Sequence, residues 1–293
     1  MADIQYNNLV SDIINRGDFE EGRNGKNLSL FGMSMRFDLT EGKIPLLTTK
    51  KLAWKTCLKE LLWFISGSTD NKKLKEQNVN IWNDNASRDF LDSRGLFHRE
   101  VDDLGPVYGH QWRHFNAKYD SCVTDYFNLD KDRGVDQLQY VIDQLKNPES
   151  RNSRRIILSS WNPQQLDEMA LPPCHILAQF NVSQGKYLSC SLYQRSGDVG
   201  LGIPFNIASY SFLTHLLAHH CGLEAKEFVH FIGNAHIYDD HIEPLKEQIT
   251  RVPFDSPTLI IKNKYENIND YKIDDFEIIN YQCHNVVKMK MRT

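Results

Sequence analysis

The stretch Tyr187-Leu-Ser-Cys-Ser-Leu-Tyr-Gln-Arg195 alternates apolar and polar side chains along its length. A period of two is typical of a β-strand with one buried face and one open face. Cys190 falls on the apolar face, and Arg195 ends the strand on the polar face. The stretch therefore predicts a long strand of a sheet that carries a guanidinium group at its end.

Other segments rich in β-branched and aromatic residues also favour strands. They are residues 156–161, 176–183, 228–233 and 258–262. Residues 28–39 alternate more loosely and suggest two strands joined at Gly32.

Apolar residues at helical spacing predict helices over residues 3–16, 54–65, 135–145 and 207–221. Residues 83–105 and 116–134 are polar and irregular, which is typical of loops and short helices. Strands and helices mix without the regular βαβ rhythm of a doubly wound sheet. We therefore expect residues 1–293 to form a single α+β domain, with a large mixed β-sheet flanked by helices.

The composition is that of an ordinary globular protein. The 293 residues are 41% hydrophobic and 25% charged, which excludes a disordered or fibrous chain. The net charge of −4 argues against a general binder of nucleic acids or anionic membranes, which would need a basic surplus. Any bound anion must therefore be held by a local group of Arg and Lys side chains.

One stretch, residues 199–223, lacks Asp, Glu, Lys and Arg and is the only candidate for a membrane span. Pro204, Asn206 and three histidines make a buried core helix the better interpretation. No secretory signal is visible at the start, and the six cysteines show no CxxC spacing. We therefore expect free thiols and a cytoplasmic location, with the nucleus as an alternative.

Common catalytic signatures are absent. The sequence has no GxxxxGKS/T, no strand-linked GxGxxG, no HExxH and no GxSxG. His215 and His219 share a helix face, but no third ligand is obvious, so a pair of core histidines is favoured over a zinc site. We expect no metal.

The segment Leu171-Pro-Pro-Cys-His175 places a thiol directly before an apolar strand. Cys174 is either a small buried hydrophobe or a nucleophile. A nucleophilic cysteine needs a nearby cation or dipole to lower its pKa. Arg195 can supply that cation if the two strands pair.

Three more sites have both a structural and a functional interpretation. Asn206 is either the N-cap of an apolar helix or an amide that pairs with a flat heterocycle. Arg154 and Arg155 form either a solvated face or a phosphate site. Glu60 lies beside an apolar stripe, where it is either a surface carboxylate or an acid–base group with a raised pKa.

Several long, ordered blocks together resemble the thymidylate synthase family over nearly the whole chain. They are Ile44-Pro-Leu-Leu-Thr-Thr-Lys-Lys, Lys59-Glu-Leu-Leu-Trp-Phe-Ile-Ser-Gly-Ser-Thr, Asp103-Leu-Gly-Pro-Val-Tyr-Gly-His-Gln-Trp-Arg, Ala170-Leu-Pro-Pro-Cys-His, Gln194-Arg-Ser-Gly-Asp and Pro204-Phe-Asn-Ile-Ala-Ser-Tyr. The segment Ser87-Arg-Asp-Phe-Leu-Asp-Ser-Arg-Gly resembles the eukaryotic-type sequence.

The resemblance implies reductive methylation of dUMP to dTMP, with methylenetetrahydrofolate as the co-substrate. It implies that the Cys174 thiolate adds to ring carbon six of uracil and that Arg195 helps to keep it ionised. Glu60 would be the acid–base residue, working through ordered water. The residues it implies in the catalytic cavity are Cys174, Glu60, Arg195, Asn206, Tyr108, His175 and Asp198.

The resemblance also implies a set of substrate contacts and a homodimer. Asn206 would bind the uracil edge, for which cytosine presents the opposite donor–acceptor pattern. Arg154 and Arg155 would reach the phosphate from the partner subunit. The implied substrate-binding residues are Arg23, Arg154, Arg155, Gln194, Arg195, Ser196, Asn206, His236 and Tyr238. The implied folate-binding residues are Ile81, Trp82, Asn85, Leu171, Asp198, Leu201, Gly202, Phe205 and Tyr238.

The chain departs from the family pattern in three places. The loop from Arg23 to Asn27 is one residue shorter than usual, Asn234 replaces the common Asp, and the chain ends in Met291-Arg-Thr293 instead of a small apolar residue. We expect the terminus still to close over the site, less tightly.

Three alternative functions stay open. A pyrimidine hydroxymethylase would use the same scaffold, although Asn206 favours uracil. RNA binding through the basic run is opposed by the acidic net charge. A Cys174–His236 hydrolase would leave the arginines unexplained.

Overall fold

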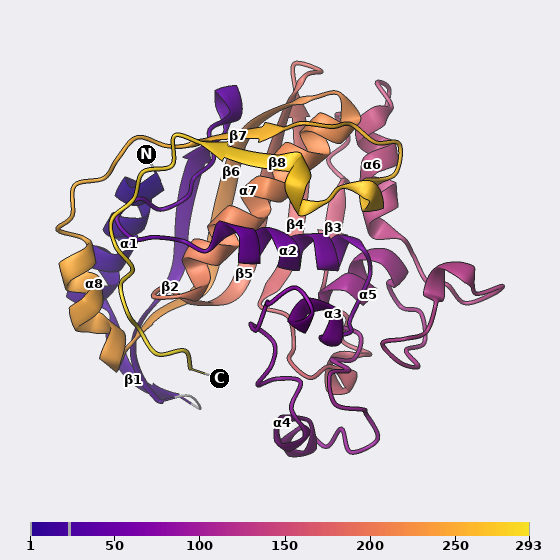
Figure 1. The fold of residues 1–293 in the computed structure, drawn as a ribbon, viewed down its shortest axis with the longest axis horizontal. Helices are drawn as coiled ribbons and strands as arrows, with labels where there is room; N and C mark the ends of the chain where they lie inside the picture. Colours follow the sequence, from indigo (N-terminus) through magenta and orange to yellow (C-terminus); the bar gives the residue numbers. More distant parts are fainter. Residues whose placement is uncertain (1, 23–24, 293) are drawn as a thin grey trace.

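The sheet forms because long alternating segments pair across the chain. The computed structural model describes residues 2–22 and 25–292. Within this part, six strands form one sheet in the order β1-β2-β6-β5-β4-β3 (Figure 1). The strands are β1 Asp18–Gly22, β2 Gly25–Asp38, β3 Ile157–Ser159, β4 His175–Ser183, β5 Tyr187–Asp198 and β6 Glu224–Tyr238. A separate antiparallel pair consists of β7 Thr258–Ile261 and β8 Phe276–Ile279.

The sheet is mixed, as the sequence predicts. Strands β5 and β6 are parallel, and every other neighbouring pair in this sheet is antiparallel. A parallel pair needs a long crossover, which the helix α7 provides. The predicted α+β class is confirmed.

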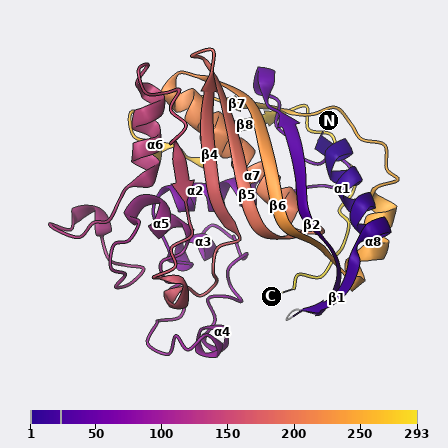
Figure 2. The ribbon, with the colours of Figure 1, turned by 180° about the vertical axis from the view of Figure 1, so that it is seen from behind.

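Helices cover one face of the sheet. The α-helices of the described residues are α1 Ala2–Arg16, α2 Trp54–Ile65, α3 Lys72–Lys75, α4 Arg88–Ser93, α5 Tyr108–His114, α6 Gln137–Lys146, α7 Gly202–Cys221 and α8 Ile242–Gln248, of which α3 and α4 lie away from the sheet (Figure 1). Helix α7 packs on β5 and β6, and α2 packs on α7 (Figure 1). On the opposite face, the broad surfaces of β4, β5 and β6 carry no helix among the described residues (Figure 2).

Helix α7 lies at the centre of the core. Most of its side chains are buried, including Phe212, Leu213 and Leu216. Gly222 ends the helix in the left-handed conformation (φ 71°), a backbone geometry that glycine adopts without a steric penalty. No helix in the described ranges is long and apolar enough to cross a membrane.

Three sequence predictions need correction. Helix α7 begins at Gly202 instead of residue 207, because Pro204 lies in the first turn, where a missing N–H breaks no helical bond. Residues 28–38 belong to one strand, β2, and Gly32 (φ 81°) only interrupts its regular backbone, while residue 39 lies just beyond the strand. Strand β6 is much longer than residues 228–233, because it pairs with both β2 and β5.

Candidate active site

Cys174 lies at the start of β4, where the pairing with β5 brings Arg195 beside it. His175 is opposite Gln194, and the Arg195 N–H donates to the Cys174 carbonyl oxygen at 2.9 Å. The guanidinium donates to the carbonyl oxygens of Pro173 and Pro172 at 2.9 and 3.0 Å. The two strands do pair, which was the condition for Arg195 to lie near Cys174, and the pairing holds the guanidinium against the segment that carries the thiol.

Tyr108, at the start of α5, supports the same segment from the other side. Its hydroxyl oxygen accepts a hydrogen bond from the Cys174 N–H at 2.8 Å. Its ring packs against His175 with centroids 5.1 Å apart. The backbone around the thiol is therefore fixed from two directions.

Glu60 lies on α2 and reaches the same region. Trp82 Nε1 donates to Glu60 Oε1 at 2.7 Å, and the Trp82 ring lies 6.1 Å from that of Tyr108. Burial raises the pKa of Glu60 to about 7, and the Trp82 bond partly opposes this rise, although part of the side chain still reaches the surface. The carboxyl group can therefore gain and lose a proton near neutral pH.

The neighbouring titratable groups are neutral. Burial lowers the pKa of His175 to about 4, with a hydrogen bond to the Asn206 side chain acting in the opposite direction. Burial also raises the pKa of Tyr108. Both groups can thus donate or accept hydrogen bonds without carrying a charge at neutral pH.

Asn206 is not a helix N-cap, because it lies in the second turn of α7. Its Oδ1 accepts a hydrogen bond from Gln194 Nε2 at 2.9 Å. This contact joins α7 to β5 at the residue next to Arg195. The interpretation of Asn206 as a helix N-cap was therefore wrong.

Asp198 organises the turn between β5 and α7. Its Oδ1 accepts hydrogen bonds from the N–H groups of Gly200 and Leu201 at 2.8 and 3.3 Å. Lys50 donates to the Gly200 carbonyl oxygen at 2.5 Å, and burial lowers the pKa of Lys50 to about 8. A Cβ at Gly200 would lie 2.5 Å from His241 Nδ1, so this position has room only for glycine.

The end of β6 lies beside this turn. Ser196 is opposite Asn234, and Asp198 is opposite His236. His236 Nδ1 lies 3.0 Å from Asn234 Oδ1, so an amide at position 234 can still hydrogen-bond the imidazole. The Tyr238 ring lies 5.2 Å from that of His236.

The described end of the chain packs against the same edge. His241 Nε2 donates to the Lys290 carbonyl oxygen at 2.8 Å. The Arg292 guanidinium lies 3.1 Å from Asp239 and 3.0 Å from Asp240, and 5.7 Å from the Tyr238 ring. Residues 290–292 therefore border the candidate site, whereas Thr293 lies outside the described residues.

Several predicted residues do not join this cluster directly. Arg154 and Arg155 are exposed in the turn before β3. Arg23 lies outside the described residues. The remaining predicted folate contacts are partly or largely buried: Ile81, Asn85, Leu171, Leu201, Gly202 and Phe205.

The histidine pair on α7 makes structural contacts. His215 Nε2 bonds the Lys43 carbonyl oxygen and His219 Nε2 bonds that of Asn263, each at 2.9 Å. Within residues 2–22 and 25–292, no group of three or more His, Cys, Asp or Glu side chains is placed to hold a metal ion.

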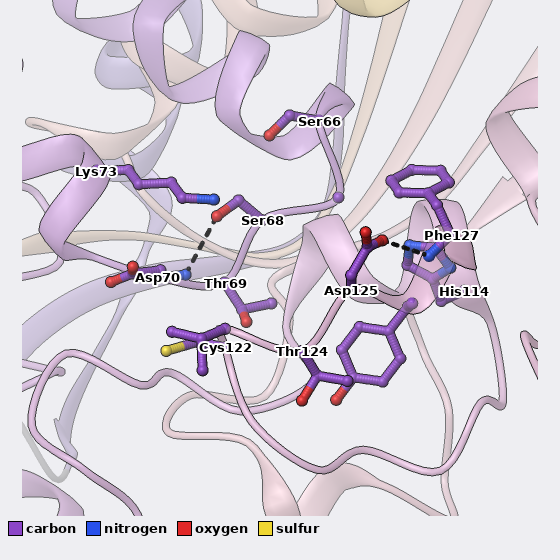
Figure 3. Close-up of a pocket in the computed structure, with 13 residues that line it drawn as sticks. Ser66, Ser68, Thr69, Asp70, Lys73, His114, Cys122, Thr124, Asp125 and Phe127 are labelled. Atoms are coloured by element: carbon purple, nitrogen blue, oxygen red, sulfur yellow. Dashed lines mark hydrogen bonds between the residues drawn. The ribbon is translucent and has the colours of Figure 1, made fainter. Parts of the chain in front are cut away.

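A pocket of about 360 Å³ lies elsewhere, between the segment after α2 and residues 122–127 (Figure 3). Ser68, Asp70 and Lys73 line one side of it, and His114 and Asp125 line the other. None of its lining residues is a predicted site residue. The chemistry argued from the sequence belongs to the cluster around Cys174, and this pocket does not contain that cluster.

Sequence reasoning missed Lys50, His230 and His241. Each is buried, and each bonds a residue distant in the chain: Gly200, Gln194 and Lys290. Periodicity shows that a polar residue falls on a buried face, but it does not identify the partner. For His230, the sequence offers one signal, which is the position of a histidine on the inward face of β6.

The comparisons with known proteins agree with this geometry. The thymidylate synthase family model matches residues 4–293. The chain is 52% identical over 292 residues to human thymidylate synthase, covering 99% of this chain and 90% of that protein. It is 52% identical over 289 residues to thymidylate synthase of equine herpesvirus 2, covering 98% and 97%.

Longer relatives also match. The chain is 52% identical over 288 residues to the bifunctional dihydrofolate reductase-thymidylate synthase of Plasmodium chabaudi, covering 98% of this chain and 48% of that protein. The chain spans about half the length of such bifunctional relatives.

Proposed function

Because the chain belongs to the thymidylate synthase family, we propose that it converts dUMP to dTMP, with methylenetetrahydrofolate as its co-substrate. The observation that carries the proposal is the contact between the Arg195 guanidinium and the carbonyl oxygens directly before Cys174. A fixed cation beside a half-buried thiol favours the thiolate. The thiolate is the nucleophile that this reaction needs.

The Cys174 thiolate forms a bond to ring carbon six of uracil. The electron pair of the ring double bond moves toward the neighbouring carbonyl and gives an enolate, which makes carbon five nucleophilic. The folate supplies the one-carbon unit and later a hydride, and leaves as dihydrofolate. Carbon five forms a bond to the one-carbon unit, and a base then removes the carbon-five proton as the bond between the one-carbon unit and the folate nitrogen breaks. The hydride from the folate reduces the resulting methylene to a methyl group, and the thiolate leaves carbon six as the ring double bond re-forms.

Glu60 moves protons in this scheme. With a pKa of about 7, it is present in both forms near neutral pH, which suits a group that must accept and return a proton through water. Neutral Tyr108 and His175 lie at the segment that carries Cys174. Their neutrality leaves Glu60 as the acid–base group of this cluster.

The Asn206 carboxamide selects the base. It can accept from the uracil ring N–H and donate to the adjacent carbonyl oxygen. Gln194, which bonds Asn206, lies behind this contact. His236 and Tyr238 bind the sugar hydroxyl.

The phosphate dianion is bound by Arg23, Arg195 and Ser196, with Arg154 and Arg155 from a second copy of the chain. The uncovered face of the sheet supports a homodimer (Figure 2). Tyr193 and Phe231 are paired on this face and are 41% and 46% exposed. Large apolar side chains side by side on an open sheet favour burial against a partner.

The folate lies against the wall that Trp82 and its neighbours form. Ile81, Trp82, Leu171 and Phe205 are packed against the hydrophobic core and offer apolar surface for a pterin. Asp198 bonds the pterin edge. The other contacts are Asn85, Leu201, Gly202 and Tyr238.

We also propose that residues 1–293 form a single domain and that the protein works in a reducing compartment. The main hydrophobic core draws on residues from Ala2 to Phe276, which supports a single domain over residues 1–293. None of the six cysteines is in a disulfide, which fits the cytoplasm.

The test of activity follows dihydrofolate formation by absorbance in a mixture of the protein, dUMP and methylenetetrahydrofolate. We expect turnover with the unaltered protein and none with Cys174→Ala. Activity that survives this substitution would overturn the mechanism. A hydroxymethylated nucleotide as the main product would instead identify a pyrimidine hydroxymethylase.

Subunit mixing tests the shared site. Cys174→Ala alone and Arg154→Ala/Arg155→Ala alone are both expected to be nearly inactive. After unfolding and refolding together, heterodimers contain one site with an intact thiol and intact arginines, so activity returns. Mixed samples as inactive as the separate variants would contradict a site built from two copies.

A further inference from the structure

A chain of hydrogen bonds, buried or partly buried, runs from β6 through β5 to Asn206 in α7. Gln194 Nε2 lies 2.9 Å from the Ser196 carbonyl oxygen and 2.9 Å from Asn206 Oδ1. A backbone carbonyl oxygen can only accept, so the end of Gln194 that faces it must be the amide nitrogen. The Asn206 atom that faces the same nitrogen must then be the oxygen.

His230 fixes the other end of Gln194. Its Nε2 lies 2.8 Å from Gln194 Oε1, which is an acceptor, so Nε2 must carry a hydrogen. The side chain is 0% exposed, and burial lowers its pKa to about 3, so the ring is neutral and has one N–H. Its Nδ1 has no hydrogen-bond partner in the described part of the chain. The single ring N–H of His230 therefore donates its hydrogen bond to Gln194.

We propose that His230 is a positioning residue that orients Gln194 and, through it, holds the Asn206 carboxamide in the orientation that selects uracil over cytosine. Gln194 is only 2% exposed. Its Oε1 accepts from the His230 N–H, and its Nε2 donates to the Ser196 carbonyl oxygen. If Gln194 turned over, its nitrogen would face the His230 N–H and its oxygen would face the Ser196 oxygen. Both contacts would be repulsive.

The orientation of the Asn206 carboxamide matters because uracil and cytosine differ only in the hydrogen-bond donors and acceptors on the edge that it contacts. Uracil offers an N–H and a carbonyl oxygen, whereas cytosine offers a bare ring nitrogen and an amino group. A carboxamide fits either base, depending on which of its ends is the oxygen. This inference rests on the proposed function, since it assumes that Asn206 contacts the pyrimidine.

The experiment compares His230→Leu with His230→Gln. Leucine is of similar bulk and has no donor, whereas glutamine keeps an N–H that can reach Gln194. We measure kcat and KM with dUMP and the competitive inhibition constant of dCMP. His230→Leu is expected to raise KM for dUMP and to lower the preference for dUMP over dCMP roughly tenfold or more, the loss expected from one misplaced buried polar contact. His230→Gln is expected to restore most of the preference.

His215→Leu is the matched control. His215 is also buried, and it also uses Nε2 in one hydrogen bond, to the Lys43 carbonyl oxygen. This substitution should lower stability to a similar extent and leave the nucleotide preference unchanged. A purely structural role for His230 predicts the same result for both leucine variants.

The ring proton is measured directly by nitrogen NMR of the unaltered protein with labelled histidine. We expect His230 to keep the proton on Nε2 between about pH 5 and pH 8, the range in which an ordinary histidine titrates. A proton on Nδ1, or protonation of both nitrogens, would overturn the inference even if His230→Leu does not fold.

These experiments distinguish failure of the proposed function from failure of the positioning role of His230. If the unaltered protein forms no dihydrofolate from dUMP, the proposed function fails, and this inference fails with it. If the unaltered protein is active and His230→Leu keeps its preference to within about twofold, the positioning role is wrong and the proposed function stands.

Discussion

At the scale of single residues, the environment of one side chain decides its chemistry. Glu60 is an ordinary carboxyl group in the sequence, and burial raises its pKa to about 7 although the Trp82 hydrogen bond acts in the opposite direction. An unfolded chain would ionise the same group at its usual lower pKa. Folding and proton uptake at Glu60 are therefore linked.

Glu60→Gln is expected to lower kcat by about a hundredfold or more, because the amide cannot exchange a proton. The same substitution is expected to increase stability relative to the unaltered protein as pH rises. Since the folded pKa lies above the unfolded one, the unaltered protein loses stability as pH rises from about 4.5 to about 7. The variant lacks this loss, so urea unfolding should show it gaining about 1–2 kcal/mol relative to the unaltered protein over that range. A constant difference would contradict the raised pKa.

Tyr108→Phe removes the hydroxyl that accepts the Cys174 N–H. We expect a loss of about 1–2 kcal/mol in urea unfolding, together with reduced turnover. Tyr126→Phe is the control, because its hydroxyl oxygen also accepts two backbone N–H groups, those of Asp120 and Ser121, away from Cys174. The control should lose stability and keep its turnover. Equal turnover in both variants would exclude a role for Tyr108 in catalysis.

At the scale of elements, Asp136 joins three helices. It caps α6 by accepting from the Gln139 N–H at 2.9 Å, and it pairs with Arg113 of α5. Arg113 in turn donates to the Ile65 carbonyl oxygen at the end of α2. One carboxylate therefore serves as both a cap and a counter-ion.

Asp136→Ala is expected to lower the free energy of unfolding by about 2–3 kcal/mol, since both functions are lost. Asp136→Asn keeps a capping oxygen and loses the charge, so about half of that loss is expected. Urea unfolding of the two variants separates the cap from the ion pair. Identical values would show that only the charge matters.

The sequence predicts the elements whose periodicity is long and undisturbed. Helix α2 was predicted with its observed bounds, and β4 and β5 within a few residues. The short strand β8 and the helix α8 were missed, because a few residues carry too little pattern. The ends of β6 depend on which strands lie beside it, and local sequence does not specify that.

The candidate site likewise has one part that the sequence predicts and another part that it does not. Cys174 and Arg195 could be predicted as neighbours, because their roles follow from residue chemistry and one strand pairing. The bond between Gln194 and Asn206 and the placement of His230 depend on side chains that meet only in three dimensions. The contribution of Arg154 and Arg155 from a partner stays a prediction.

At the scale of the whole molecule, the described end of the chain is attached by charge more than by burial. Arg292→Ala removes both contacts with Asp239 and Asp240. We expect faster trypsin cleavage after Lys288 and Lys290, with the free energy of global unfolding changed by less than about 1 kcal/mol because such pairs are exposed.

Lys246→Ala, which removes an exposed pair with Glu243 on α8, is the control for this tail. It should leave the cleavage rate unchanged. If Arg292→Ala is cleaved no faster than this control, the ion pairs do not hold the terminus.

The pairing of β2 with β6 has a consequence for how the protein is made. Residues 25–38 leave the ribosome long before their sheet neighbour, which spans residues 224–238. Until that late segment emerges, the nascent chain carries a long strand with unsatisfied backbone groups, a known liability for aggregation. Completion of the sheet must therefore wait for the synthesis of residues 224–238, and chaperone dependence should be greatest just before that segment emerges.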